Sequence, residues 1–174
     1  SSAASDVYKR QFLTQPLTQF YSFSSTLKKD NITISNHIVS YVMRPVDERL
    51  CRKTGHATGS AVHELVRLRS GQGEPLMIET SYLPVKRFPS LDIERLENGS
   101  LYDFLTAAYG FEIHNARETL RPVMPLPQEK ELLQITGTLP CILLERFTYE
   151  NGACAEYTKS IVRGDKYIFS VELK

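Results

Sequence analysis

The sequence predicts an α+β domain with a mainly antiparallel sheet, and three observations support this prediction. Residues 61–84, AVHELVRLRSGQGEPLMIETSYLP, read as two strands joined by the turn sequence SGQGEP. A second hairpin, with Asn151-Gly152 at its tip, falls within residues 140–173. The helical and extended segments follow one another without the regular βαβ order that indicates a parallel sheet. We therefore expect one α+β domain in which consecutive strands pair as hairpins.

Length and composition fit one globular domain. The chain has 174 residues, 41% hydrophobic and 24% charged, with a formal net charge of +1. This composition excludes a disordered or fibrous chain, and the charge gives no electrostatic case for nucleic-acid binding by this segment. No apolar run approaches the ~18 residues of a membrane span. Cys51, Cys141 and Cys154 lack CxxC spacing and indicate reduced thiols in a cytoplasmic protein.

The first residues are expected to lead from a tail into the domain. Residues 1–14 read as a tail or linker remnant, so that the domain begins at Gln15. Residues 22–29, SFSSTLKK, indicate a short helix whose serine-rich start displays hydroxyls and backbone N–H groups suited to an anion. A capped helix without a ligand explains the same residues, and from these residues alone it is favoured.

A strand and a helix follow before the first hairpin. Residues 36–46, NHIVSYVMRPV, are rich in β-branched and aromatic side chains, which favour a strand. Asp47 is placed to cap a short amphipathic helix, ERLCRKTG, which closes at Gly55. Leu50 and Cys51 are expected on the buried side of this helix.

Further segments separate the two hairpins. Residues 85–100 indicate a loop with a short helix, and Ser100 caps a better helix, LYDFLTAAYG, which ends at Gly110. Residues 111–124 return to strand character, and QEKELLQITG indicates a third helix. The side chains expected to face the core are Leu101, Phe104, Leu105 and Ala108 of the former helix and Leu132, Leu133 and Ile135 of the latter.

The first hairpin brings charged side chains together. Strand side chains alternate between faces, so Arg67 and Arg69 share a face, roughly 6.5–7 Å apart along the strand. In one register Arg67 lies across from Glu79, and Arg69 lies across from Met77. Two guanidinium groups can hold a dianion, and the carboxylate can accept hydrogen bonds from the same ligand. An ordinary solvent-facing sheet surface with a weak cross-strand ion pair also explains the hairpin, and from the hairpin alone it is favoured.

Other candidate motifs favour local structural roles. Arg163-Gly164-Asp165 matches a cell-adhesion tripeptide but fits better as a turn with local hydrogen bonds. Thr119 and Arg121 share one face of the 111–124 strand and either line a pocket or lie on a solvated face. The 4 histidines have no i, i+4 partner on a helix, so we expect neither a metal site nor a cofactor.

Four segments, in order, resemble the effector-binding UTRA domain of GntR-type transcription regulators of the HutC subfamily. They cover most of the chain from Gln15 to its end. The matching segments are QPLTQFYSFSSTLKK, ELVRLRSGQGEPLMIETSYLP, NGSLYDFLTAAYGFEI and PCILLERFTYENGACAEYTKSIVRGDKYIFSVEL.

The resemblance implies a fold and a role. It implies the chorismate-lyase-like fold, a six-stranded antiparallel sheet flanked by helices, over residues 15–174. Such domains sense a small metabolite and control DNA binding by an N-terminal winged helix-turn-helix, which is absent from this chain. We therefore expect a cytoplasmic homodimer without a membrane partner, and contact with DNA only through the absent domain.

The resemblance also implies site residues. In the sugar-phosphate-sensing members, matching positions place the phosphate on Arg67, Arg69 and the Ser22-Phe23-Ser24 loop. Glu79 and Glu156 match carboxylates that bind ligand hydroxyl groups. Many members have a tyrosine where this chain has Val162, which removes a hydroxyl and an aromatic surface from the pocket. The complete set of expected ligand-binding residues is Ser22, Phe23, Ser24, Arg67, Arg69, Glu79, Tyr82, Thr119 and Glu156.

The predicted ligand is a small anionic metabolite, a phosphorylated sugar or amino sugar. Alanine at both Arg67 and Arg69 is expected to abolish its binding and leave the fold intact, as strand-surface arginines rarely support a core. A chorismate-lyase-like enzyme acting on a small carboxylate substrate is the alternative, because the same fold hosts a lyase. A dimerisation module without a ligand is the third interpretation. The serine loop and the linker-like start favour the regulator, so no catalytic residue is expected.

Overall fold

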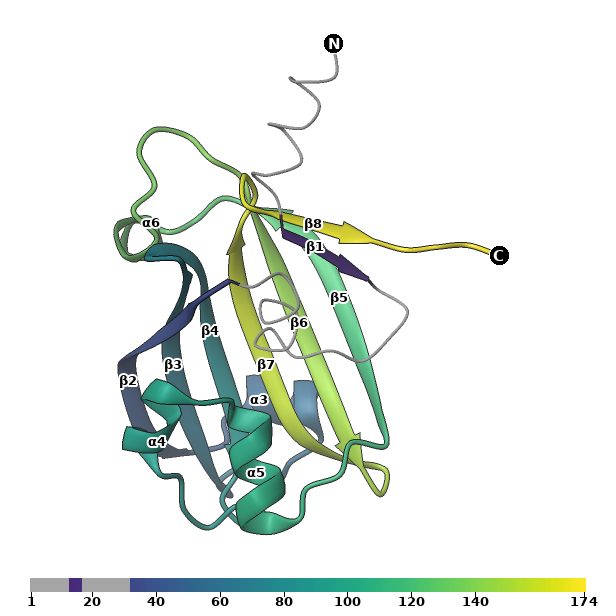
Figure 1. The fold of residues 1–174 in the computed structure, drawn as a ribbon. Helices are drawn as coiled ribbons and strands as arrows, with labels where there is room; N and C mark the ends of the chain where they lie inside the picture. Colours follow the sequence, from purple (N-terminus) through teal and green to yellow (C-terminus); the bar gives the residue numbers. More distant parts are fainter. Residues whose placement is uncertain (1–12, 17–31) are drawn as a thin grey trace.

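The computed structural model describes residues 13–16 and 32–174, which form a sheet-centred α+β fold (Figure 1). No helix in this described part is long and apolar enough to cross a membrane. In chain order the elements are β1 (Leu13–Pro16), β2 (Ile34–Pro45), α3 (Glu48–Thr54), β3 (Ala61–Gly71), β4 (Glu74–Pro84), α4 (Ile93–Asn98), α5 (Leu101–Tyr109), β5 (Asn115–Val123), α6 (Pro127–Leu132), β6 (Cys141–Glu150), β7 (Ala153–Arg163) and β8 (Tyr167–Ser170).

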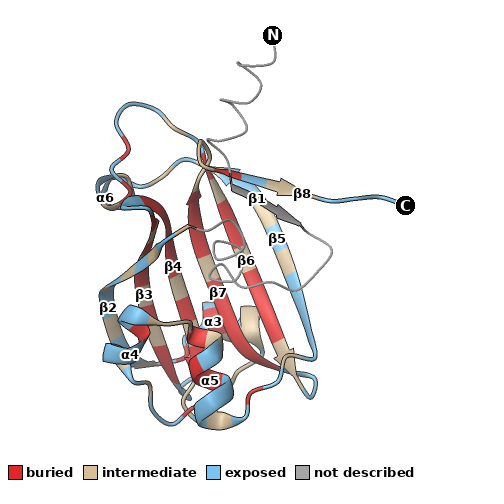
Figure 2. Ribbon diagram, in the orientation of Figure 1, coloured by how far each residue is buried: buried red, intermediate tan, exposed pale blue. Residues whose placement is uncertain are grey.

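The main sheet has six strands in the order β2-β3-β4-β7-β6-β5, and every neighbouring pair is antiparallel. Strands β1 and β8 form a separate two-stranded parallel sheet. The predicted α+β class and six-stranded antiparallel sheet are confirmed. Figure 2 shows that burial is greatest along the central strands β4, β7 and β6, whereas the edge strand β5 is largely exposed.

Helices pack on both faces of this sheet. Helices α4 and α5 cover one face, here the inner face (Figure 1). On this face Leu65 and Leu83 join Phe104 and Leu105 in one buried cluster. On the opposite, outer face, Leu50 of α3 packs in a cluster with strand residues that include Phe147 and Tyr157. The sheet therefore lies between two apolar layers. Sheet side chains that point toward a helix are buried beneath that helix.

Both predicted hairpins are present, and their turns explain their registers. Gln72 and Gly73 have φ values of 52° and 79°, and Asn151 and Gly152 have φ values of 50° and 79°. Two successive residues with positive φ match the twist of antiparallel strands, so each turn fixes how its strands align. In the first hairpin Arg67 pairs with Glu79 and Arg69 with Met77, which confirms the expected register.

The predicted ends of α3 and α5 are also confirmed. Asp47 Oδ1 accepts a hydrogen bond of 2.8 Å from the backbone N–H of Leu50, and Gly55 closes α3 with φ of 77°. Ser100 caps α5 in the same way, and Gly110 ends it in the left-handed conformation. These are the residue types whose side chains or missing Cβ atoms best satisfy helix termini. The expectation for Ala108 is wrong, because this residue of α5 is exposed.

Three element boundaries differ from the prediction. Strand β5 begins at Asn115 instead of residue 111, because Phe111 is buried in the α5 cluster and residues 111–114 run over the core instead. Helix α6 ends at Leu132, and Gln134 follows with φ of 54°, so Leu133 and Ile135 are buried beyond the helix end. Leu132 itself is only half-buried. Residues 13 and 14, assigned to the tail, belong to β1.

Gly164 and Asp165 lie in a turn, as expected, directly after Arg163 ends β7, and an ion pair of 2.8 Å joins Arg163 to Asp165. A Cβ atom on Gly164 would lie 2.3 Å from the carbonyl oxygen of Pro140. Because this neighbour is backbone, we expect Gly164→Ala to destabilise the domain by about 1–3 kcal/mol, the usual cost of overpacking. Urea unfolding measures this change. Gly99→Ala, whose closest contact is 3.2 Å, serves as the control and should cost less; equal costs would contradict the steric explanation.

Candidate functional site

Arg67, Arg69 and Glu79 form a buried cluster on the inner face, between β3 and β4. Their exposed fractions are 1%, 4% and 9%. Arg67 Nη2 donates to Glu79 Oε1 at 2.5 Å, and Arg69 Nη1 lies 3.2 Å from Glu79 Oε2. Arg69 Nε also donates to Asn36 Oδ1 on β2 at 2.9 Å. The cross-strand register thus places one carboxylate between two guanidinium groups, away from solvent.

Within the described residues, the guanidinium group of Arg67 makes fewer hydrogen bonds than it can donate. Its Nε and Nη1 atoms are buried, and neither finds a hydrogen-bond partner in the part of the chain that the structure describes. A buried donor without a partner costs free energy, and more so when the group is charged. An anion placed against these two N–H groups would be held by the edge of the guanidinium plane, which is the geometry that arginine offers to phosphate and carboxylate.

The pKa values of the cluster keep its charges at neutral pH. Burial opposes ionisation of Glu79, but the positive charges of Arg69 and Arg67 outweigh it and lower the pKa of this carboxyl to about 2. Burial lowers the pKa of Arg69 to about 10, although the charge of Glu79 acts in the opposite direction. Both groups are therefore ionised near pH 7, and they hold a fixed arrangement of charge.

A second polar group lies further along the inner face, on β6 and β7. Cross-strand pairing aligns Glu118, Arg146 and Thr158 in one row and Thr148 with Glu156 in the next. Arg146 Nε donates to Glu118 Oε1 at 2.5 Å, and Arg146 Nη1 lies 3.4 Å from the hydroxyl of Tyr102 on α5. This helix therefore brings a phenol over the same sheet face.

Glu156 is the acceptor of this second group. It is 2% exposed, and its Oε1 accepts a hydrogen bond of 2.5 Å from Thr158 Oγ1. Its Oε2 is buried without a hydrogen-bond partner among the described residues. Burial raises the pKa of the Glu156 carboxyl, and the negative charge of Glu79 adds to the rise. The register between β6 and β7 shifts between Thr148 and Tyr149, beside Glu156. Bulges of this kind are common next to functional sites.

The sequence profile of the UTRA domain matches residues 30–168, which is most of the chain. The chain belongs to the UTRA domain family. Among characterised proteins, it is 28% identical over 158 residues to the HTH-type transcriptional repressor NagR of Bacillus subtilis, covering 90% of this chain and 65% of NagR. It is 23% identical over 164 residues to the mannosyl-D-glycerate transport/metabolism system repressor MngR of Escherichia coli, covering 94% and 68%.

Solved structures agree with this assignment. The effector domain of PhnF from Mycobacterium smegmatis superposes with a TM-score of 0.83 at 25% identity, covering 92% of this chain and 99% of that domain. The longer PhnF structure gives a TM-score of 0.85 at 26% identity, covering 94% of this chain and 72% of PhnF. The chain spans about two thirds of the length of the curated relatives that it matches.

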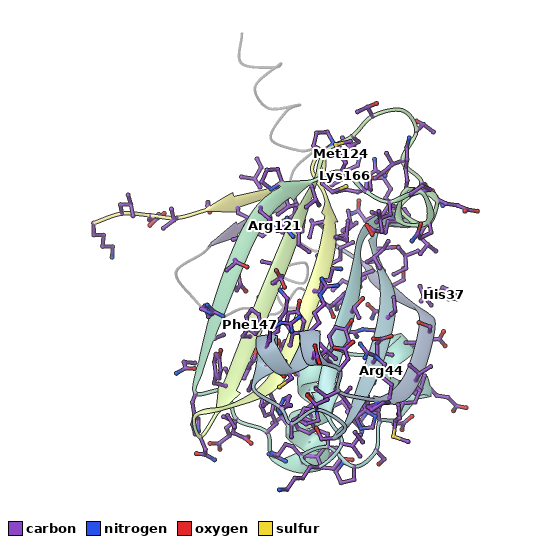
Figure 3. The ribbon with its side chains drawn as sticks, turned by 180° about the vertical axis from the view of Figure 1, so that it is seen from behind. His37, Arg44, Arg121, Met124, Phe147 and Lys166 are labelled. Carbon is purple, nitrogen blue, oxygen red and sulfur yellow. The ribbon has the colours of Figure 1, made fainter. Side chains whose placement is uncertain are left out.

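The UTRA domain brings four predicted site residues to one sheet face and separates two others from them. Arg67, Arg69, Glu79 and Glu156 share the inner face. Tyr82 instead stacks on Tyr157 at 5.4 Å between ring centroids, on the outer face below Arg44. Figure 3 looks onto this face, where Arg44 and Phe147 are labelled.

Thr119 is also placed on the outer face. It is exposed and pairs across β5 and β6 with Glu145, which contacts Lys53 of α3 at 2.5 Å. The alternation of strand side chains is the reason, since Thr119 lies one residue from the inward-facing Glu118. Ser22, Phe23 and Ser24 lie outside the described residues.

Val162 is buried on the inner face beside Met77, in a cluster that also contains Tyr167 of β8. Met77 is the cross-strand partner of Arg69, so the cluster brings a tyrosine from another strand near the arginine pair. Val162, which stands where many members of the family have a tyrosine, therefore gives this region an apolar wall. The phenol of Tyr167 reaches the same region from β8.

Sequence reasoning missed Arg146, Tyr102, Thr158 and Asn36. Arg146 could have been found from strand alternation. It lies two residues after Leu144 and so on the same face of the strand, which is also the face of Glu118. Asn36 pairs with Arg69 only through the alignment of β2 with β3, which the sequence does not state. Tyr102 reaches the site because of how α5 packs, and no local pattern signals that contact.

We expect Glu156→Gln to raise the stability of the domain in alkaline solution. Because the folded-state pKa of Glu156 is raised above its ordinary value of 4.5, ionising it weakens the folded state as the pH rises through that pKa. Glutamine keeps the acceptor for Thr158 and removes this penalty. Melting temperatures at pH 8 should rise by about 2–4 °C, the shift that 1 kcal/mol produces in a chain of this size, and the gain should vanish near pH 4.

Glu145→Gln is the matched control for that measurement. Burial opposes ionisation of Glu145, but hydrogen bonds from Lys53 and Tyr157 outweigh it and lower its pKa. Its ionised form therefore stabilises the fold above the ordinary pKa, so this variant should lose stability at pH 8 and approach the parent at low pH. A Glu156→Gln variant that melts below the parent at both pH values would contradict the claim that ionisation of Glu156 destabilises the folded domain.

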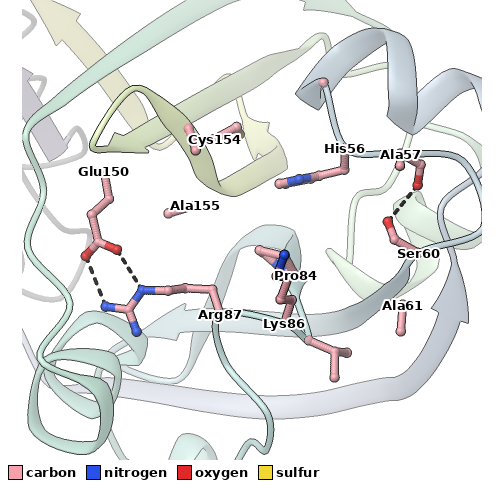
Figure 4. Close-up of a pocket in the computed structure, with 13 residues that line it drawn as sticks. His56, Ala57, Ser60, Ala61, Pro84, Lys86, Arg87, Glu150, Cys154 and Ala155 are labelled. Atoms are coloured by element: carbon pink, nitrogen blue, oxygen red, sulfur yellow. Dashed lines mark hydrogen bonds and ion pairs between the residues drawn. The ribbon is translucent and has the colours of Figure 1, made fainter.

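The structure also contains a cavity away from the arginine pair. It has a volume of about 710 Å³ and lies between the α3–β3 loop, the end of β4 and the tip of the β6–β7 hairpin (Figure 4). Its wall is mostly apolar, and Arg87 there donates to Glu150 at 2.6 Å. Within residues 32–174, no three His, Cys, Asp or Glu side chains gather closely enough to hold a metal ion.

Proposed function

We propose that this UTRA domain is the effector-binding part of a transcription regulator and that it senses a small anionic metabolite, a phosphorylated sugar or amino sugar. The observation that supports the anion is the pair of buried N–H groups on Arg67 that have no partner in the described chain. A phosphate or carboxylate would satisfy them, and Arg69 lies beside them to share the charge.

The second polar group supports a ligand with a polar body. Glu156 offers a buried oxygen without a hydrogen-bond partner among the described residues, and Tyr102, Thr158 and Arg146 lie around it. Glu156 lies four residues along β7 from Ser160, the cross-strand partner of Glu79, which is roughly 13 Å of strand. A small molecule with an anionic end and a hydroxyl- or amine-bearing end fits two such groups better than a single ion does.

The relatives support the regulatory role. NagR and PhnF are named as HTH-type transcriptional repressors, and MngR is named as the repressor of a mannosyl-D-glycerate system. We infer that the regulator acts in the cytoplasm as a homodimer, because two DNA-binding heads related by symmetry read two half-sites. DNA is then contacted by a winged helix-turn-helix that precedes the UTRA domain, and the effector alters the affinity of that contact.

Calorimetric titration of the chain with a panel of phosphorylated sugars tests this proposal. Saturable binding of at least one member with 1:1 stoichiometry is expected. A turnover assay with chorismate tests the enzyme alternative, and product formation above the buffer rate would favour the lyase over the sensor. Binding of no phosphorylated sugar by a folded chain would remove the sugar-phosphate assignment.

A further inference from the structure

Glu79 occupies the arginine pair in a way that affects any incoming anion. Its Oε1 accepts from Arg67 Nη2 at 2.5 Å, and its Oε2 lies 3.2 Å from Arg69 Nη1. The carboxylate therefore binds both guanidinium groups with its two oxygens. All three side chains are buried, so water competes little for these contacts and the attraction between them is strong.

The contact with Arg67 uses only one end of its guanidinium group. Nη2 faces Glu79, whereas Nε and Nη1 are the buried atoms without a partner in residues 32–174. A carboxylate engaged at one nitrogen leaves the remaining donors open to a second anion. That anion would then lie close to Glu79, and two like charges on one guanidinium repel each other.

The charges around the two groups are nearly balanced before a ligand arrives. On the described inner face the cations Arg67, Arg69 and Arg146 are paired with two carboxylates, Glu79 and Glu118. A phosphate dianion added to this set produces an excess of negative charge unless one carboxylate is compensated. Glu79 is the carboxylate nearest to the arginine pair, and it stays ionised because its pKa is about 2.

We propose that Glu79 is an internal counter-ion that competes with the effector's anionic group for Arg67 and Arg69, and that the effector must re-pair it with a hydrogen-bond donor of its own. This inference rests on the proposed function of the site. A ligand with an anionic group and a neighbouring hydroxyl or amine satisfies both requirements. Inorganic sulfate, a tetrahedral dianion that carries no proton at neutral pH, satisfies only the first, so Glu79 excludes it and makes the site selective for the bifunctional molecule.

The test compares binding of inorganic sulfate by the parent chain and by Glu79→Gln, by calorimetry at constant ionic strength. Glutamine keeps the shape and one acceptor oxygen but removes the competing charge. We expect Glu79→Gln to bind sulfate at least tenfold more tightly than the parent. Glu64→Gln is the matched control, because Glu64 pairs with Arg44 at 2.8 Å on the outer face of the same hairpin; it should bind sulfate as the parent does.

The outcomes separate this inference from the proposed function. If Glu79→Gln binds sulfate no more tightly than the parent while the parent binds a phosphorylated sugar, the counter-ion inference is overturned and the anion site stands. If neither chain binds sulfate or any phosphorylated sugar, both proposals fail together.

A second variant covers loss of folding, since Glu79→Gln leaves two buried guanidinium groups with less compensation. Glu79→Asp draws the carboxylate back by one methylene and keeps its charge. It should bind sulfate more tightly than the parent, and added sulfate should raise its melting temperature by more than that of the parent. An Asp variant that responds to sulfate as the parent does contradicts the inference.

Discussion

Replacing Arg67 and Arg69 together by alanine is expected to destabilise the domain by about 3–5 kcal/mol, as well as to abolish anion binding. The sequence alone suggested a surface pair whose loss the fold would tolerate. The structure places both side chains in the interior, in ion pairs with Glu79. Removing the cations leaves a buried carboxylate without compensation, and breaking a buried ion pair from one side has costs of this size.

A triple variant separates the cost of the stranded charge from the cost of lost packing. Methionine at residues 67, 69 and 79 fills similar volume with no charge, and apolar replacement of a whole buried ion-pair cluster is often neutral or stabilising. Denaturant unfolding should therefore show the double alanine variant far below the parent and the triple methionine variant close to it. A triple variant as unstable as the double one would show that the arginines stabilise the domain through packing or hydrogen bonds instead.

Lysine at residue 67 is expected to weaken binding of a phosphorylated sugar by about 100-fold while the chain remains folded. Lysine keeps the positive charge opposite Glu79, so the buried ion pair survives in part. It loses the planar edge formed by Nε and Nη1, the two buried donors without a described partner. Charge-assisted bidentate contacts are worth roughly 1.5–3 kcal/mol, which corresponds to about ten- to a hundredfold in affinity.

Calorimetry on Arg67→Lys checks this expectation, and Arg44→Lys is its control. Arg44 also pairs with a glutamate of the same hairpin, at 2.8 Å, but on the outer face. The control should keep the parent's affinity and report any general effect of exchanging arginine for lysine. Equal losses in the two variants would place the anion elsewhere than against Arg67.

The first hairpin was predictable in detail because its information is local. The glycine-containing turn fixes the register, and the alternation of strand side chains then places Arg67 opposite Glu79. The burial of this pair was not predictable, because it depends on the helices and strands that cover the inner face. The prediction therefore paired Arg67 with Glu79 correctly but placed them on the surface.

The remaining differences come from strand alternation and from tertiary packing. Tyr82 lies three residues after Glu79 and so faces the outer side, an outcome that strict alternation implies and that the inclusion of Tyr82 overlooked. Tyr102 and Arg146 join the site through the position of α5 over β6, which no single segment specifies. Strand β5 begins later than predicted because Phe111, four residues before its start, is buried in the cluster of α5.

The most direct test of the account is a titration with a matched pair of ligands, a phosphorylated sugar that binds and the same sugar without its phosphate. If the arginine pair holds an anion, the phosphorylated sugar binds the parent chain at least 100-fold more tightly than the neutral sugar, and Arg67→Lys removes most of that difference. Equal affinity for the two sugars, or a difference that persists unchanged in Arg67→Lys, would contradict the claim that Arg67 and Arg69 form the anion site.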